Sequence, residues 1–291
     1  MDYLYLGITV LCSASAGVFG AYYNQKTAER KDPSPLYNVL YCLTALLGWA
    51  VLFATDPSFV PGVLPYSLGF GLSYVICQIG LINALRTGPV SLTSLFLQLS
   101  LIATTVWGFF FWDESFSVTI GIGLVLVGVS LWLCLYKGKT PKEEAVRATP
   151  KWFLFVLMAI VGNAGCAIIQ KTQQRQFEGK YGNQLMVVAI AISVLFSLVL
   201  YLRSNHSDTK PILKSATLFP VGAGLCNVVL NLLVILLATS TVPSSLVYPV
   251  IAVGGLAVTS IFSLLAFREK LRYWQWIGIG VGAASVVLLS L

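Results

Sequence analysis

Long apolar runs follow one another along almost the whole chain, and polar residues gather in the short breaks between them. Ten of the runs contain no Asp, Glu, Lys, Arg or His. A bilayer core about 30 Å thick requires roughly 20 helical residues, and charged side chains are excluded because their desolvation is expensive. The pattern therefore predicts an all-α integral membrane protein with ten transmembrane helices. The predicted spans are Tyr3–Asn24, Leu36–Ala54, Pro65–Leu85, Ser91–Phe111, Val118–Tyr136, Trp152–Gln170, Asn183–Leu202, Ala216–Ala238, Ser244–Phe267 and Tyr273–Leu291.

The composition leaves no room for a soluble domain. Charged residues make up only 10% of the chain, compared with roughly 25% in an average soluble domain. The longest connections between spans, Lys137–Lys151 and Arg203–Lys214, show no apolar period and are predicted to be polar loops. Any chemistry must therefore come from polar residues inside the spans.

The residues that enzymes, metal sites and nucleotide sites require do not cluster in the spans. All six cysteines fall in apolar runs, without a C-x-x-C pair or a nearby histidine, and are expected to be small buried side chains. The glycine-rich runs neither follow a strand nor precede Lys-Ser/Thr, which argues against a phosphate cradle. No basic run alternates with aromatic residues as in nucleic-acid binding. We therefore expect no enzyme, no catalytic residue, no metal, no cofactor and no nucleic-acid partner.

An internal repeat divides the chain into two halves. The segment Gly17–Thr27 (GVFGAYYNQKT) aligns with Gly162–Thr172 (GNAGCAIIQKT), and Glu114 aligns with Glu269 later in the halves. We therefore predict a five-helix repeat over residues 1–137, a polar linker over residues 138–151 and a second five-helix repeat over residues 152–291. Since each half has an odd number of spans, the second enters the membrane from the opposite side, as in the inverted repeats of many secondary transporters.

These features resemble the drug/metabolite transporter superfamily, in particular its ten-span EamA-like members. The resemblance covers essentially the whole chain. It rests on the 5+5 repeat, on Lys26 and Lys171 after the first span of each half, on tight hairpins at Arg86–Val90 and Thr239–Pro243, and on an acidic residue followed by a glycine-rich helix.

The resemblance implies that helices one to four and six to nine surround a central cavity, with helices five and ten at the periphery. Members of this superfamily move small metabolites or drugs. The chain departs from the family pattern in the fourth helix of each half. A proline often found midway along it is absent from Ser91–Phe111, and Pro249 lies near the start of the ninth span.

Polar residues within the spans are the candidate substrate ligands, because an unpartnered amide in lipid costs several kcal/mol and must face protein, water or solute. Their side chains would form a neutral cavity of amides and aromatic rings, suited to zwitterions, polar neutral solutes or organic cations. For each of them an interhelical hydrogen bond is the competing interpretation. The candidates are Tyr74, Gln78, Gln98, Asn163, Asn227, Asn231 and Tyr248.

Other span residues suggest gating or packing. Lys26 and Lys171 close symmetry-related helices and are interpreted either as gate or steering groups for an anionic moiety or as snorkelling anchors. Four aromatics near span ends, Tyr22, Tyr23, Trp107 and Trp112, are expected in the interfacial belts. Small residues let helices approach closely. The glycines expected to pack helices are Gly121, Gly123, Gly128, Gly278, Gly280 and Gly282.

The basic residues predict an orientation. Of the eighteen Lys and Arg residues, all but Lys171, Arg175 and Lys180 fall in loops after odd-numbered spans. The positive-inside rule then places those loops in the cytoplasm and both termini outside, whereas the family is expected to have both termini inside. We favour the charge rule, in a bacterial-type plasma membrane with lipid headgroups as partners of the basic loops.

Together these patterns predict a secondary-active or facilitative transporter of small polar metabolites, of the amino acid, nucleoside or amine class, for instance in metabolite export. It would work by alternating access, as a monomer or a homodimer. No span contains Asp or Glu, which argues against proton-for-cation exchange through a membrane carboxylate. The alternatives are a structural or signalling membrane protein without transport, and a channel.

Overall fold

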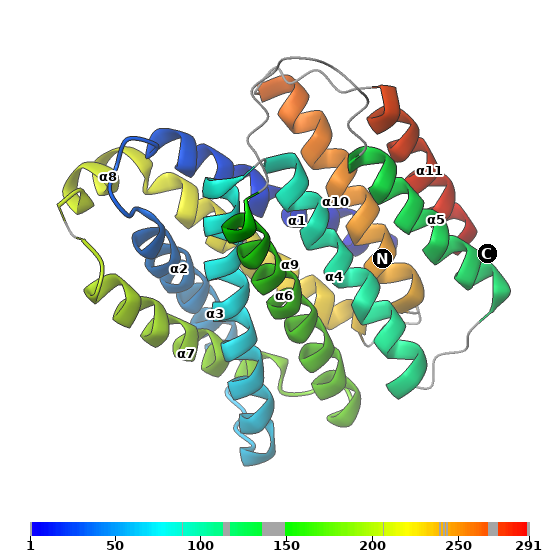
Figure 1. Cartoon of the computed structure of the whole chain (residues 1–291). Helices are drawn as coiled ribbons and strands as arrows, with labels where there is room; N and C mark the ends of the chain where they lie inside the picture. Colours follow the sequence, from blue (N-terminus) through cyan, green and yellow to red (C-terminus); the bar gives the residue numbers. More distant parts are fainter. Residues whose placement is uncertain are drawn as a thin grey trace.

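The protein is a bundle of helices that pack side by side (Figure 1). The computed structural model describes residues 2–88, 90–112, 117–135, 149–205, 207–238, 240, 242, 244–266 and 273–289, and all regular structure within them is helical. The helices are α1 (Asp2–Lys26), α2 (Ser34–Thr55), the short 3-10 helix η1 (Pro61–Val63), α3 (Leu64–Thr87), α4 (Val90–Phe111), α5 (Val118–Leu135), α6 (Pro150–Gln176), α7 (Gly182–Leu202), α8 (Thr209–Ala216), α9 (Leu218–Ala238), α10 (Ser244–Ala266) and α11 (Tyr273–Leu289).

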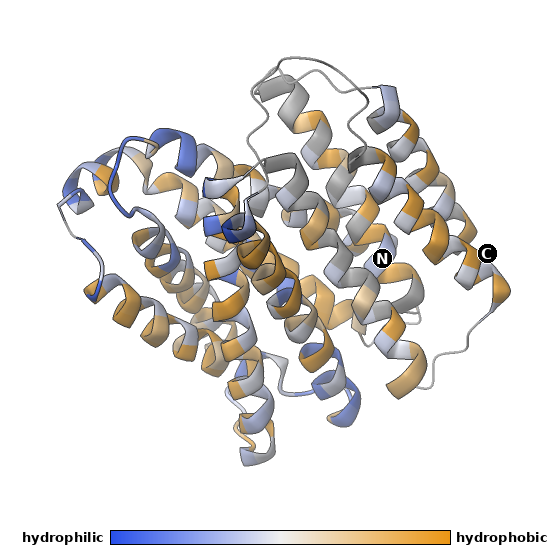
Figure 2. Cartoon of the chain, viewed as in Figure 1, coloured by the Kyte–Doolittle hydropathy of each residue, from blue (hydrophilic) through white to orange (hydrophobic). Residues whose placement is uncertain are grey.

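The helices have the length and composition of an integral membrane protein. Among the described residues, six helices are long and apolar enough to cross a bilayer, namely α1, α2, α3 with η1, α6, α7 and α9. Large apolar side chains such as Leu47, Val51 and Phe110 are exposed on the outside of the bundle. Figure 2 shows hydrophobic residues along the lengths of the helices and the most hydrophilic residues gathered at their ends. This is the distribution that a lipid environment favours.

Prolines mark where several of these helices begin. Proline occupies one of the first two positions of α2, α3 and α6, where its missing N–H costs no helical hydrogen bond. Thr149 also caps α6, since its Oγ1 accepts a hydrogen bond from the backbone N–H of Trp152 at 3.2 Å. Each of these ends follows from local sequence.

Contacts between helices far apart in the sequence hold the bundle together. The main pairs are α3 with α6, α5 with α11, α1 with α9, α2 with α7, α3 with α7, α4 with α10, α1 with α10, α2 with α9, and α4 with α6. The pair α5 and α11 lies at one edge of the molecule, away from α2, α7 and α8 (Figure 1).

The contact between α3 and α6 depends on two glycines. A Cβ on Gly162 would lie 2.4 Å from the backbone nitrogen of Cys77, and one on Gly80 would lie 2.5 Å from that of Ala159. The two backbones therefore touch, which only glycine permits.

Among the glycines predicted to pack helices, the structure separates close contacts from open positions. A Cβ on Gly282 would lie 2.7 Å from Ser130 Oγ, and the Gly278 carbonyl accepts a hydrogen bond from that same hydroxyl at 2.6 Å. At Gly128 and Gly280 none of the described residues lies within 4 Å of such a Cβ, so the described part of the chain does not show the close helix approach expected there. Both belong to glycine-rich helices, and only the glycines on the side facing a neighbour can pack.

Two other local expectations need correction. The Arg203–Lys214 connection is not the loop that its polar sequence predicts, because α8 occupies Thr209–Ala216. Its apolar side depends on only two buried residues, Ile212 and Ala216, too few to register as a period in the sequence. The second correction concerns α6, which continues to Gln176. Lys171 therefore lies inside this helix and does not close it.

Candidate functional site

A cavity of about 120 Å³ lies inside the bundle and is lined by residues of α1, α2, α3, α4, α6, α9 and α10. None of the described residues that line it is Asp, Glu, Lys, Arg or His. Aliphatic side chains such as Leu81, Val234 and Ile251 form its apolar wall. The polar side chains that line it are Thr9, Ser13, Tyr41, Gln78, Asn163, Gln170, Asn227, Asn231 and Tyr248.

Two asparagines one turn apart on α9 form the best-defined part of this site. The Nδ2 of Asn231 donates to Asn227 Oδ1 at 3.0 Å, and the hydroxyl of Tyr74 donates to the same oxygen at 2.9 Å. Asn227 Oδ1 thus accepts two hydrogen bonds, one from its own helix and one from α3. These bonds hold the Asn227 side chain in one orientation.

The neighbouring amides join this arrangement from other helices. Gln78 donates from Nε2 to the Tyr41 hydroxyl at 3.2 Å, and the Nε2 of Gln170 lies 3.5 Å from Asn231 Oδ1. Asn163 donates from Nδ2 to Ser100 Oγ at 2.6 Å. A primary amide carries two N–H donors and a carbonyl acceptor. The bonds named here use only some of these, so the amides of Gln78, Gln170 and Asn163 retain capacity to bind a polar solute.

A column of aromatic rings supports the tyrosines of the site. The ring of Tyr41 stacks on that of Tyr74 with centroids 6.1 Å apart, and Tyr37 and Phe70 continue the column on either side, each 5.9 Å from its neighbour. Such stacking restricts the side-chain rotamers. The hydroxyls of Tyr41 and Tyr74 are therefore presented from fixed positions.

Most of the residues predicted to bind substrate come together here. Gln78, Asn163, Asn227, Asn231 and Tyr248 line the cavity. Tyr74 lies behind it as the hydrogen-bond donor to Asn227, and the side chain of Gln98 is outside the described residues.

Four polar lining residues were not among the predicted ligands, namely Thr9, Ser13, Tyr41 and Gln170. Tyr41 follows Tyr37 by one helical turn, a spacing that could have drawn attention to it. Gln170 lies on the same side of α6 as Asn163, two turns further on.

Lys26 and Lys171 do not line the cavity. Lys26 is exposed as the last residue of α1. Lys171 is buried, with 8% of its surface exposed, and its Nζ lies 5.0 Å from the centroid of the Trp112 ring. The two lysines therefore occupy different environments despite their matching places in the repeat.

Trp112 forms a buried contact between the end of α4 and the last turns of α6. Its Nε1 donates to Thr172 Oγ1 at 3.2 Å, Lys171 lies over its ring, and Arg175 donates to its carbonyl oxygen. We call these four residues the Trp112 contact. Only 4% of Trp112 is exposed, so the expectation that it lies in an interfacial belt is wrong. The place of Trp112 at the end of a predicted span does not reveal that α6 covers its ring.

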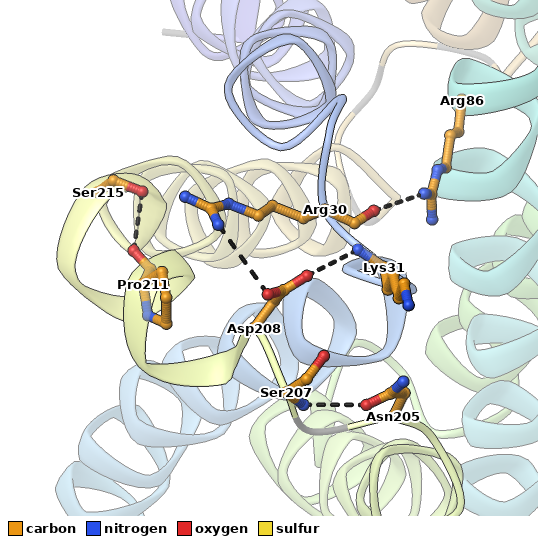
Figure 3. A network of polar contacts seen from close by, with 8 residues as sticks. All are labelled: Arg30, Lys31, Arg86, Asn205, Ser207, Asp208, Pro211 and Ser215. Carbon is orange, nitrogen blue, oxygen red and sulfur yellow. Dashed lines mark hydrogen bonds and ion pairs between the residues drawn. The ribbon is translucent and has the colours of Figure 1, made fainter.

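A second polar contact lies near the end of α7, at the opposite end of the bundle from the Trp112 contact. Asp208 accepts a hydrogen bond from the backbone N–H of Lys31 at 2.9 Å, and its other oxygen lies 3.9 Å from the Arg30 guanidinium (Figure 3). Arg86 donates to the Arg30 carbonyl at 3.0 Å. We call this group, formed by Arg30, Lys31, Arg86 and Asp208, the Asp208 contact.

The comparisons with known proteins bear on the fold alone. No family model and no curated protein matches the chain. Among solved structures 29 chains match. One, titled "Crystal structure of protein", has a TM-score of 0.63 and 12% identity over 97% of this chain and 98% of that chain. The two chains therefore share a helical fold over nearly their whole length, while that title specifies no activity.

Proposed function

We propose that the chain is a secondary-active or facilitative transporter of small polar metabolites, of the amino acid, nucleoside or amine class. The observation that carries this proposal is the uncharged cavity, whose amide and tyrosine side chains come from both proposed halves. A site between two bodies that can move against each other is the arrangement that alternating access requires. The resemblance to EamA-like drug/metabolite transporters belongs to the same proposal.

The helix contacts support two halves related by an approximate two-fold axis. We match α1 with α6, α2 with α7, α3 with α9, α4 with α10 and α5 with α11. Under this exchange the pair α3–α6 becomes α9–α1, α3–α7 becomes α9–α2, and α4–α6 becomes α10–α1, and all of these are main contacts. The pairs α2–α7, α4–α10 and α5–α11 map onto themselves. Such matching favours ten spans in two inverted repeats.

The size of the cavity favours a small solute. Its volume of about 120 Å³ exceeds the space of a single water but lies below the roughly 300–1,000 Å³ of drug-sized sites. Its amides can donate to and accept from one solute, and tyrosine faces can attract an ammonium group. Zwitterions and small polar amines fit this chemistry better than large apolar drugs.

The test is counterflow uptake by the purified protein in liposomes. Labelled amino acids, nucleosides and quaternary amines are offered with and without a pH gradient. Saturable, counterflow-stimulated uptake of one class supports a carrier. Rapid flux without saturation indicates a channel, and absence of flux across the panel favours a structural or signalling role. Dependence on the pH gradient contradicts the expectation that no proton is exchanged.

The variant Asn231→Ala links uptake to the cavity. Losing one buried polar contact with the solute costs about 1–3 kcal/mol, which corresponds to roughly 5- to 150-fold weaker apparent affinity. Asn205→Ala is the matched control, because Asn205 is exposed in the α7–α8 connection and should leave uptake unchanged. Unaltered affinity in Asn231→Ala, with the fold intact, excludes this cavity as the substrate site.

Gate or steering roles for Lys26 and Lys171 remain part of the proposal. The double variant with both lysines changed to Gln tests them. Unchanged transport and affinity would remove this role. A smaller maximal rate at unchanged affinity would indicate gating, since neither side chain lines the cavity.

The basic loops support an orientation with both termini outside a bacterial-type plasma membrane. Cysteine labelling with a reagent that does not cross membranes tests it in whole cells. A cysteine at Lys210 should be protected, and one at Lys180 should react. The reverse pattern would establish the family's expected orientation.

A further inference from the structure

The short helix α8 has two different sides. Ile212 and Ala216, one turn apart, are buried, with 2% and 0% of their surfaces exposed, and α8 contacts α1 and α9. Lys210 and Lys214, also one turn apart, are exposed, and Leu213 beside them is 41% exposed. An amphipathic helix with lysines and an apolar residue on its outer side has the character of an interfacial segment.

The position of α8 agrees with this character. It connects α7 with α9, two helices that are long and apolar enough to span a bilayer, and Figure 1 shows it at the end of the bundle. Because α8 lies at the ends of the apolar helices α7 and α9, its outer side is at the depth of the lipid headgroups. Lysines at such a depth extend their ammonium groups towards phosphate while their stems pack on apolar surface.

The charge around α8 is strongly positive. Segments 26–32 and 203–214 together with Arg86 hold seven cations (Lys26, Arg30, Lys31, Arg86, Arg203, Lys210 and Lys214) and three acids (Glu29, Asp32 and Asp208), a difference of +4. Asp208 is engaged by Arg30 and by the backbone of Lys31 (Figure 3). The acid that directly precedes α8 is thus already paired, and the two lysines of α8 face outwards.

We propose that α8 is a docking site for an anionic phospholipid of the surrounding bilayer. The lipid phosphate binds between Lys210 and Lys214, and its acyl chain lies against Leu213. A lipid is favoured over a free phosphate because the exposed leucine accompanies the lysines. The inference does not depend on which solute the protein transports.

The test is the retention of lipid by the full chain. The protein is reconstituted in vesicles of phosphatidylcholine mixed with phosphatidylglycerol and extracted in mild detergent, and the bound lipids are counted by native mass spectrometry. We expect phosphatidylglycerol to be retained in preference to phosphatidylcholine. Each lysine near an anionic headgroup contributes about fivefold in affinity, so Lys210→Gln with Lys214→Gln should weaken retention about 25-fold.

Lys180→Gln is the matched control, since Lys180 is an exposed lysine at the other end of α7. It should retain phosphatidylglycerol as the unchanged protein does. Equal retention in the double lysine variant, or equal losses in Lys180→Gln and the double variant, would overturn the site. Competition by inorganic phosphate at the affinity of the lipid would show that a free anion, not a lipid, is the ligand. Circular dichroism of both variants verifies that the helices remain intact.

Discussion

The Trp112 contact and the Asp208 contact both join distant parts of the chain, at opposite ends of the bundle, but their surroundings differ. Trp112 and Lys171 are buried, with 4% and 8% of their surfaces exposed. In the Asp208 contact the side chains of Arg30 and Asp208 are 44% and 22% exposed. The first combines an aromatic ring, a cation and an indole hydrogen bond, while the second is an ion pair and two hydrogen bonds to backbone groups.

Burial decides how strongly each contact holds. Water and salt screen an exposed ion pair, whose contribution is typically below about 1 kcal/mol. A cation over an aromatic ring contributes more once both are removed from water. The Asp208 contact should therefore break at lower cost than the Trp112 contact.

The largest effect is expected for Trp112→Ala. This change removes the ring under Lys171, the hydrogen bond to Thr172 and the packing of a large buried side chain, at a cost of about 3 kcal/mol or more. Reversible unfolding in detergent measures it. Trp107→Ala on α4, five residues earlier, is the control, because Trp107 is 38% exposed and its truncation should lower the free energy of unfolding much less. Equal losses in the free energy of unfolding for the two variants would show that burial does not distinguish Trp112 from Trp107.

A smaller effect is expected for Lys171→Met, which keeps the length of the side chain and removes its charge. The loss of the cation over Trp112 should lower the free energy of unfolding by about 0.5–2 kcal/mol. Combining this change with Trp112→Leu, which removes the ring, in a double-mutant cycle isolates the pair. Strictly additive effects would mean that ring and ammonium do not interact.

The smallest effect is expected for Asp208→Asn, which should lower the free energy of unfolding by less than about 1 kcal/mol. Raising the salt concentration to 1 M, where the Debye length is about 3 Å, should abolish most of that difference. The effect of Lys171→Met should persist at the same salt concentration. A salt-resistant Asp208→Asn effect larger than that of Lys171→Met would reverse the order of the two contacts.

Much of the site could be predicted from the sequence because its signals are local. Amides in apolar runs are conspicuous, and the i, i+4 spacing of Asn227 and Asn231 places both on one side of a helix whatever surrounds it. As a result, five of the predicted residues do line the cavity. Whether these amides bind a solute remains a prediction.

The contacts between helices could not be predicted in the same way. Trp112 and Lys171 both lie near span ends, where belts and snorkelling are the usual interpretation, and neither position reveals that the two side chains meet. Gly128 and Gly280 belong to the same kind of run as Gly282, and only a neighbouring helix decides which glycine is in close contact. In α8 the buried pair Ile212 and Ala216 is too short a pattern to predict a helix.

The sequence alone determined that the chain is helical and apolar, where its long helices lie and which of their residues are polar. These properties follow from the bilayer, which excludes charge and demands internal backbone hydrogen bonds along each span. Tertiary structure alone decided which polar residues meet. A lipid-exposed helix surface and a helix-packed one are equally apolar in membranes, so the neighbours of each helix depend on how complementary surfaces fit together.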